Sequence, residues 1–277
     1  MKCAWKELIH ILPHTYRLAA ERLAGECLQE IRLRLQQSPE MILKNKKITW
    51  DRLVTEEDLQ FVINTASRYS PWLAASSASG YITAPGGHRI GICGEAVMKE
   101  GNVSGFRCIR SLNIRISRDF PGLCGNLGER DGSILILGKP GSGKTTLLRD
   151  MIRQRSLREN VSVVDERGEI FPIYGGFHEG KATDIISGCP KPQGIEAVLR
   201  TMSPDTIAVD EITAESDCQA LLHAGWCGVK LLATAHASDK QDLLSRPIYA
   251  PLVQSGLFSW LVILQPDKSW HLERMEL

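Results

Sequence analysis

The residues best suited to chemistry are the glycines, lysine and threonines of GKPGSGKTT, at positions 138–146. The stretch matches G-x-x-x-x-G-K-[ST], a pattern in which glycines let backbone N–H groups curl around phosphate oxygens. Lys144 would supply a cation to the outer phosphates of ATP, and Thr145 would place its hydroxyl on Mg²⁺. The sequence therefore predicts a site for ATP and Mg²⁺. The residues expected to bind the nucleotide are Gly138, Lys139, Pro140, Gly141, Ser142, Gly143, Lys144, Thr145 and Thr146.

The setting of this motif supports that interpretation. The apolar run SILIL (133–137) precedes it directly, and the helical run TLLRDMIRQ (146–154) follows it. A phosphate-binding loop needs this order of strand, loop and helix, because the helix points the positive end of its dipole at the phosphates. A glycine-rich turn with an exposed lysine is the simpler interpretation of the loop alone, and the order of the elements argues against it.

Two carboxylates end the apolar run PDTIAVDE (204–211). Asp210 is suited to hold Mg²⁺ through water, so Thr145 and Asp210 are the expected metal ligands. Glu211 is suited to take a proton from the attacking water or to orient that water. Taken alone, the stretch could equally be a solvated acidic pair after an edge strand. The phosphate-binding loop upstream favours the catalytic interpretation.

Two further apolar runs end in polar residues. VVDERGEI (163–170) ends in a group of acids that includes Asp165 and Glu169, and LLATAHAS (231–238) ends just after His236. Ligands gather at the carboxyl ends of the strands of a parallel sheet, so both groups are expected to reach the phosphate site. His236 would then lie next to the γ-phosphate and the attacking water. A surface histidine that ends a strand is the alternative.

The elements that position these residues alternate along the carboxyl-terminal half of the chain. Short strands are expected at 133–137, 161–164, 206–209 and 230–234. Segments that read as helices or loops separate them, which predicts an α/β domain over residues 133–277 with a mainly parallel sheet and crossover helices. The glycine-rich residues 121–132 are the expected linker to this domain.

Residues 1–120 have the pattern of a smaller α+β domain. Residues 30–36 alternate between apolar and polar side chains, which predicts an amphipathic strand. Thr55 and Asp58 have the spacing of a helix-capping box. Residues 80–118 alternate again between glycine-containing turns, which predicts two or three antiparallel strands.

Composition argues against several classes of protein. The 33 basic and 32 acidic side chains leave a formal charge of +1, and no basic stretch is interleaved with aromatics, so no specific nucleic acid partner is expected. The eight cysteines form no C-x-x-C pair, which predicts reduced thiols and a cytoplasmic protein. With neither a signal peptide pattern nor an apolar run of membrane-spanning length, attachment to a membrane is expected only through a partner.

The order of these motifs resembles that of the secretion ATPases of type II and type IV systems and their pilus-retraction relatives. GKPGSGKT, VVDERGE, VLRTMSPDTIAVDE and HAGWCGVKLLATAH are similar to the Walker A, acidic, Walker B and histidine boxes of these proteins. EIRLRLQ, APGGHRIGICGEAV and IRSLNIRISR resemble the family of stage III sporulation protein AA, secretion-ATPase-like proteins of endospore formers. The resemblance covers residues 28–270 and does not extend to a tetracysteine zinc module.

The resemblance implies a RecA-like P-loop ATPase that forms a hexamer. Such a protein would hydrolyse ATP to ADP and phosphate at the cytoplasmic face of a membrane complex during sporulation. It also implies that Glu169, Glu211 and His236 are catalytic, and that an arginine of the smaller domain completes the site. The candidates are Arg89, Arg107, Arg110 and Arg115.

Two other functions remain open at this point. One is a RecA-like motor that pulls on nucleic acid, against which the balanced charge argues. The other is an assembly scaffold that binds nucleotide and hydrolyses it slowly or not at all. The full set of acidic residues argues against the scaffold.

Overall fold

The computed structural model of the chain describes residues 2–3, 5–23, 28–43, 46–69, 80–172, 176–265 and 267–275. It divides into two compact units. The first is Met1–Asp119 together with Pro172–Phe177, and the second is Phe120–Phe171 together with His178–Leu277. No helix within the described residues is both long enough and apolar enough to cross a membrane.

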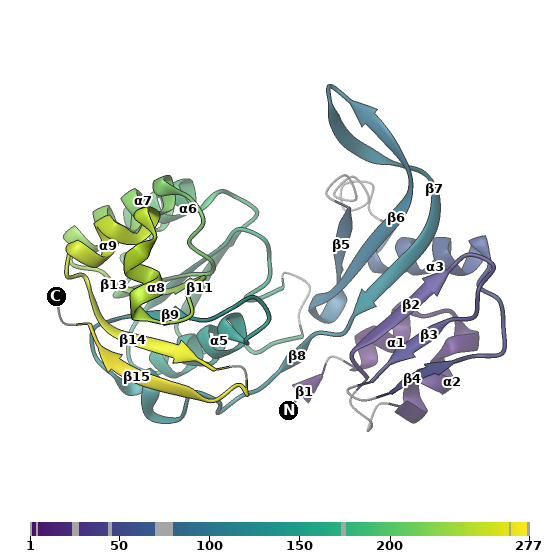
Figure 1. Cartoon of the computed structure of the whole chain (residues 1–277), viewed down its shortest axis with the longest axis horizontal. Helices are drawn as coiled ribbons and strands as arrows, with labels where there is room; N and C mark the ends of the chain where they lie inside the picture. The colour runs from purple at the N-terminus through teal and green to yellow at the C-terminus, as the bar shows by residue number, and fades with distance from the viewer. Residues whose placement is uncertain are drawn as a thin grey trace. The chain divides into compact units, whose positions relative to one another are not determined.

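The amino-terminal unit is built on a six-stranded antiparallel sheet in the order β4-β3-β2-β7-β6-β5 (Figure 1). The strands of this sheet are β2 (Glu30–Arg34), β3 (Glu40–Ile42), β4 (Lys47–Thr49), β5 (Tyr81–Ala84), β6 (His88–Lys99) and β7 (Asn102–Arg115). A separate antiparallel pair joins β1 (Lys2–Cys3) to β8 (Arg118–Asp119). Among the described residues of the unit, the helices are α1 (Trp5–Ile11), α2 (His14–Leu23), α3 (Glu56–Ala66) and the short 3-10 helix η3 (Pro85–Gly87).

Local sequence explains several of these elements. Alternation in β2 places Ile31 and Leu33 in the core, where both are fully buried, so the predicted amphipathic strand is confirmed. The predicted capping box is confirmed too. Thr55 Oγ1 accepts the Asp58 N–H at 3.2 Å, and the Asp58 carboxylate accepts the Thr55 N–H at 3.0 Å. Pro13 separates α1 from α2, because a residue that precedes proline avoids the helical conformation.

Strands β6 and β7 form a long hairpin that extends beyond the sheet (Figure 1). Glu100 and Gly101 make its turn, with φ angles of 51° and 79°. Of β6, the stretch paired with β5 is His88–Gly91, and of β7, the stretch paired with β2 is Ser111–Arg115. The antiparallel strands predicted over residues 80–118 are thus confirmed as β5, β6 and β7.

The second unit contains a seven-stranded sheet in the order β11-β10-β12-β13-β9-β14-β15 (Figure 1). All neighbours are parallel except β14 and β15, which are antiparallel. The strands are β9 (Ser133–Leu137), β10 (Val161–Asp165), β11 (Thr183–Ser187), β12 (Thr206–Val209), β13 (Lys230–Ala235), β14 (Phe258–Leu264) and β15 (Trp270–Arg274). The helices are α5 (Lys144–Arg155), α6 (Lys191–Thr201), α7 (Glu215–Trp226), α8 (Lys240–Ser245) and α9 (Ala250–Gln254).

Strands β9, β10, β12 and β13 match the four expected from the sequence to within one residue at each end. Strands β11, β14 and β15 were not predicted. β11 is a partly exposed edge strand, so it lacks the continuous apolar run of a buried parallel strand. β14 lies in an apolar stretch, residues 252–264, that polar residues interrupt, and α9 ends within the same stretch.

The glycine-rich residues 121–132, expected as a linker, belong to the second unit. They include a short 3-10 helix, η4 (Gly125–Glu129). Asp150 of helix α5 holds the beginning of this stretch, because its carboxylate accepts the N–H groups of Gly122 at 3.0 Å and Cys124 at 2.8 Å. The stretch is therefore attached to the helix that follows the phosphate-binding loop.

Alternate residues of β9 pack on opposite faces of this sheet. Leu135 and Leu137 share a buried cluster with residues of α6 and α7, such as Val198 and Leu221. Since side chains alternate along a strand, the residues between them face the other side. Burial on both faces explains why every residue of β9 is buried.

Candidate nucleotide-binding site

The loop between β9 and α5 can be built only with glycine at its key positions. A Cβ atom at Gly138 would lie 2.4 Å from Ser142 Oγ and 3.2 Å from Leu264 Cβ. Gly141 and Gly143 have φ angles of 75° and 105°, in the left-handed region that side chains disfavour. Gly143 is also the N-cap of α5, so the free N–H groups of the first helical turn begin directly after it.

Lys144 curls back across this loop. Its ammonium donates to the carbonyl oxygens of Gly138 at 2.9 Å and Lys139 at 3.1 Å, and it lies 3.0 Å from Nδ1 of His236. Burial lowers the pKa of Lys144, while the negative charges of Asp210 and Glu211 act in the opposite direction. The loop thus holds a buried ammonium whose usual hydration is replaced by protein groups.

Thr145 and Asp210, the expected metal ligands, lie side by side. Thr145 Oγ1 donates to Asp210 Oδ2 at 2.6 Å, and the fully buried Thr234 donates from its hydroxyl to Asp210 Oδ1, also at 2.6 Å. Thr234 Oγ1 in turn accepts the Glu211 N–H at 2.8 Å. One threonine of β13 therefore fixes both acids that follow β12.

Glu211 has a left-handed backbone conformation, with a φ of 49°, which is rare for a residue with a side chain. Its carboxylate lies between two partners. Glu211 Oε1 is 2.7 Å from His236 Nε2, and Glu211 Oε2 is 3.2 Å from Arg167 Nη1. Because the ammonium of Lys144 can only donate, His236 Nδ1 must accept, and Nε2 must carry the proton that is shared with Glu211.

Asp165 ends β10 but does not point its carboxylate into open space. It accepts the N–H groups of Glu169, Ile170 and Phe171, each at 2.9 Å. Burial raises the pKa of Asp165, and these three N–H groups oppose that rise. The side chain therefore folds the acidic loop. Asp165 also lines a small cavity together with Asp210 and Glu211, and that this strand end reaches the phosphates stays a prediction.

Glu169 lies on that loop, and its backbone is held from two sides. Arg149 of α5 donates from Nη2 to the Glu169 carbonyl at 2.8 Å, while Asp165 accepts the Glu169 N–H. A small cavity of about 20 Å³, the size of one water molecule, lies beside it. The residues around this cavity are Asp165, Glu166, Arg167, Glu169, Lys191, Asp210 and Glu211.

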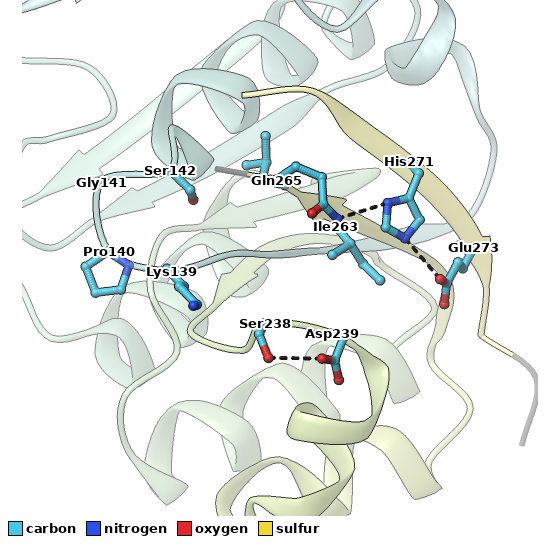
Figure 2. A pocket seen from close by; sticks show the side chains of 11 residues that line it. Lys139, Pro140, Gly141, Ser142, Ser238, Asp239, Ile263, Gln265, His271 and Glu273 are labelled. Atoms are coloured by element: carbon cyan, nitrogen blue, oxygen red, sulfur yellow. Dashed lines mark hydrogen bonds and ion pairs between the residues drawn. The ribbon is translucent and has the colours of Figure 1, made fainter. Parts of the chain in front are cut away.

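A larger cavity of about 580 Å³ adjoins the outer side of the loop (Figure 2). Its lining comes from the loop, from the residues that follow β13 and from the end of the β14–β15 hairpin: Lys139, Pro140, Gly141, Ser142, Ser238, Asp239, Ile263, Leu264, Gln265, His271 and Glu273. Figure 2 shows His271 between Gln265 and Glu273. His271 Nδ1 is 3.4 Å from Gln265 Nε2, and His271 Nε2 is 3.1 Å from Glu273 Oε1. Lys139 belongs to this lining but Lys144 and Thr145 do not, so the cavity adjoins the loop without including the residues expected to bind the outer phosphates and Mg²⁺.

The residues of the loop fit the phosphates of a nucleotide. The buried Ser142 Oγ has no hydrogen-bond partner among the described residues, and the space beside Gly138 is closed to any larger residue. Thr145 and Asp210 offer the hard oxygen donors that Mg²⁺ prefers. Thr146 follows in the first turn of α5. The arrangement can hold phosphates and a divalent cation next to a paired glutamate and histidine.

The candidate arginines belong to the amino-terminal unit. Arg89 lies over the ring of Tyr81, 3.9 Å from its centre, and Arg107 pairs with Glu95 at 3.3 Å. Arg110 and Arg115 are exposed on β7. That one of these four completes the site stays a prediction.

Sequence reasoning missed two arginines of the second unit. Arg149 binds the carbonyl groups of the acidic loop, and Arg167 contacts Glu211. Arg167 was visible as the basic residue inside the acidic motif VVDERGEI. Arg149 had no comparable signal, because it reads as an ordinary polar residue of an amphipathic helix.

The chain matches the family model described as "Sporulation stage III, protein AA" over residues 5–271. Stage III sporulation protein AA of Bacillus subtilis is 34% identical over 270 residues, which cover 91% of this chain and 88% of that protein. The pilus retraction motor PilT with bound ADP has a TM-score of 0.65 at 14% identity, over 94% of this chain and 82% of its own. The Legionella pneumophila ATPase DotB has a TM-score of 0.59 at 16% identity, over 93% of this chain and 78% of its own. The two structures share the α/β fold of this chain.

Proposed function

The chain belongs to the family of sporulation stage III protein AA, and we propose that it is an ATP-hydrolysing motor. It energises the assembly of, or transport through, a membrane complex during endospore formation. One observation carries the ATPase proposal. Lys144, the Thr145–Asp210 pair and the Glu211–His236 pair come from three different strand ends and meet at one edge of the sheet.

ATP binds with its phosphates in the loop of residues 138–146. Backbone N–H groups of the loop and of the first turn of α5 donate to the phosphate oxygens. Lys144 exchanges the two carbonyl oxygens that it now contacts for β- and γ-phosphate oxygens. The hydroxyl of Ser142, which has no partner within the part of the chain that the structure describes, adds one more donor.

Thr145 and Asp210 would hold Mg²⁺, Thr145 directly and Asp210 through water. When bound, this ion neutralises part of the charge on the phosphate oxygens. The hydrogen bond from Thr234 keeps the Asp210 carboxylate in one orientation. The chain thus orients its ligands for a hard cation before any cation binds.

Glu211 is the general base for hydrolysis. A water molecule in the small cavity beside Glu211 and Glu169 attacks the γ-phosphorus, and its proton passes to the Glu211 carboxylate. The new bond joins the water oxygen to phosphorus, and the bond from phosphorus to the bridging oxygen of ADP breaks. Glu169 lines the same cavity and helps to orient the water. His236 connects Glu211 to Lys144, so that the orientation of the base responds to the γ-phosphate.

The assembled motor is a hexamer on the cytoplasmic face of a membrane complex, held there through a partner protein. The fold shared with a pilus retraction motor supports this proposal. In the ring, an arginine of residues 80–118 approaches the phosphates of the same or a neighbouring chain. Sedimentation at rising protein concentration with a non-hydrolysable ATP analogue tests the ring. A strictly monomeric protein with full ATPase activity would remove the ring as a requirement.

The test of the whole proposal is phosphate release by the purified full chain with ATP and Mg²⁺, with and without DNA. We expect hydrolysis that does not depend on DNA and that disappears in Lys144→Ala. Strong stimulation by DNA would favour a nucleic-acid motor. Binding of ATP without turnover would favour an assembly scaffold, and no binding at all would contradict the nucleotide site.

A further inference from the structure

The carboxylate of Glu211 is held at both of its oxygens, by groups from two different strand ends. His236, after β13, takes Oε1 at 2.7 Å, and Arg167, after β10, takes Oε2 at 3.2 Å. A glutamate side chain has three rotatable bonds, and one partner leaves it free to swing about that contact. Two partners on opposite oxygens select one orientation.

Arg167 belongs to a loop whose backbone is fixed. On the loop's inner side, Asp165 accepts three N–H groups of residues 169–171, and Arg149 donates to the carbonyl oxygens of Glu169 and Ile170. The origin of the Arg167 side chain is therefore held by buried hydrogen bonds. An exposed arginine on a fixed loop can act as a reproducible contact for Glu211.

The other cation beside the small cavity is already engaged. Lys191 is buried, and its ammonium pairs with Glu166 at 2.7 Å and Asp217 at 3.6 Å. Those two carboxylates neutralise it at the start of α6. Arg167 is thus the cationic side chain of the acidic loop that contacts Glu211.

We propose that Arg167 is a positioning residue for Glu211. Its guanidinium fixes the carboxylate against His236, so that a lone pair of Glu211 points at the attacking water when the proton is transferred. Each carboxylate oxygen has two lone pairs, so one partner on each oxygen leaves capacity to accept that proton. This inference rests on the proposed ATPase function.

The pair contributes little to folding, which makes a clean test possible. The side chain of Arg167 is 51% exposed and that of Glu211 is 30% exposed. Pairs this open to water add little to stability, since solvent screens them. Replacing Arg167 should therefore leave the melting temperature nearly unchanged, and any loss of turnover would come from the site.

The experiment compares kcat and ATP KM of the full chain with those of Arg167→Ala and Arg167→Lys. We expect Arg167→Ala to lower kcat about tenfold with little change in KM, because an interaction needed only for proton transfer is lost. Arg167→Lys should recover part of the loss by keeping the charge. Arg158→Ala is the matched control, since Arg158 is 58% exposed and pairs with Glu129 at the other end of α5.

A double variant separates positioning from direct action on the phosphates. If Arg167 acts through the Glu211 carboxylate, Arg167→Ala should cause no further loss in a Glu211→Gln background. The same tenfold loss in that background would overturn the proposal and make Arg167 a direct phosphate contact. A kcat of Arg167→Ala within twofold of the parent would overturn it as well. In both cases an ATPase that still depends on Lys144 would leave the proposed function intact.

Discussion

His236 lies between Lys144 and Glu211 and contacts both, with Nδ1 3.0 Å from the ammonium and Nε2 2.7 Å from the carboxylate. The imidazole thus connects the group that would bind phosphate to the group that would deprotonate water. When Lys144 turns toward a phosphate, the histidine loses a donor, and its contact with Glu211 can change in response. Occupancy of the loop and the orientation of the base are therefore coupled through one ring.

Replacing this ring should slow turnover more than it weakens binding. A hydrogen bond to a charged partner is worth about 1.5–3 kcal/mol, so His236→Ala should lower kcat by roughly ten- to a hundredfold. ATP affinity should change much less. His271→Ala is a matched control, because His271 also contacts a glutamate, at 3.1 Å, and lies in the larger cavity. If a folded His236→Ala protein keeps its kcat, His236 has no role in turnover and is only a surface histidine at the end of a strand.

Glu211→Gln should keep nucleotide affinity and lose turnover. The amide fills the same space and can still meet His236, but it cannot accept a proton as a carboxylate does. Equilibrium ATP binding and single-turnover hydrolysis separate the two effects. Glu196→Gln, in an exposed pair with Arg200, is the control. If Glu211→Gln turns over normally, the role of base passes to Glu169.

ATP binding should take up protons at alkaline pH. Burial lowers the pKa of Lys144 in the free protein, whereas anionic phosphates favour its charged form. Above the lowered pKa the free lysine is neutral, so binding restores a proton. Calorimetry in buffers of different ionisation enthalpy should show a proton uptake on ATP binding. This uptake should grow as the pH rises toward the ordinary pKa of lysine. Lys144→Arg keeps its charge, and equal uptake in that variant would assign the protons elsewhere.

Thr234→Val should cost both stability and activity. It leaves the Glu211 N–H without its acceptor and removes a donor from Asp210, which should lower the free energy of unfolding by about 1–3 kcal/mol. It should also raise the Mg²⁺ concentration needed for half-maximal hydrolysis. Thr206→Val is the control, because Thr206 is equally buried and hydrogen-bonded but lies at the start of β12. An equal shift in Mg²⁺ dependence for both variants would contradict a local role.

Much of the candidate site was visible in the sequence, because its motifs are local. The spacing of GKPGSGKTT between an apolar run and a helix predicts the loop, since three glycines and a helix start are needed within a few residues. The apolar runs before Asp210 and His236 predict two strand ends, because a buried strand also appears in the sequence as a short continuous run. Even the cap of α3 follows from two residues three positions apart.

Tertiary structure alone decided which of these residues touch. Lys144 and His236 are 92 positions apart, and Glu211 meets Arg167 across 44 positions. Both contacts exist because the sheet places β13 beside β9 and β12 beside β10, an order that no local pattern contains. The contacts of Asp165, by contrast, are local, since its carboxylate accepts the N–H groups of Glu169, Ile170 and Phe171 in its own loop and so helps to fold that loop.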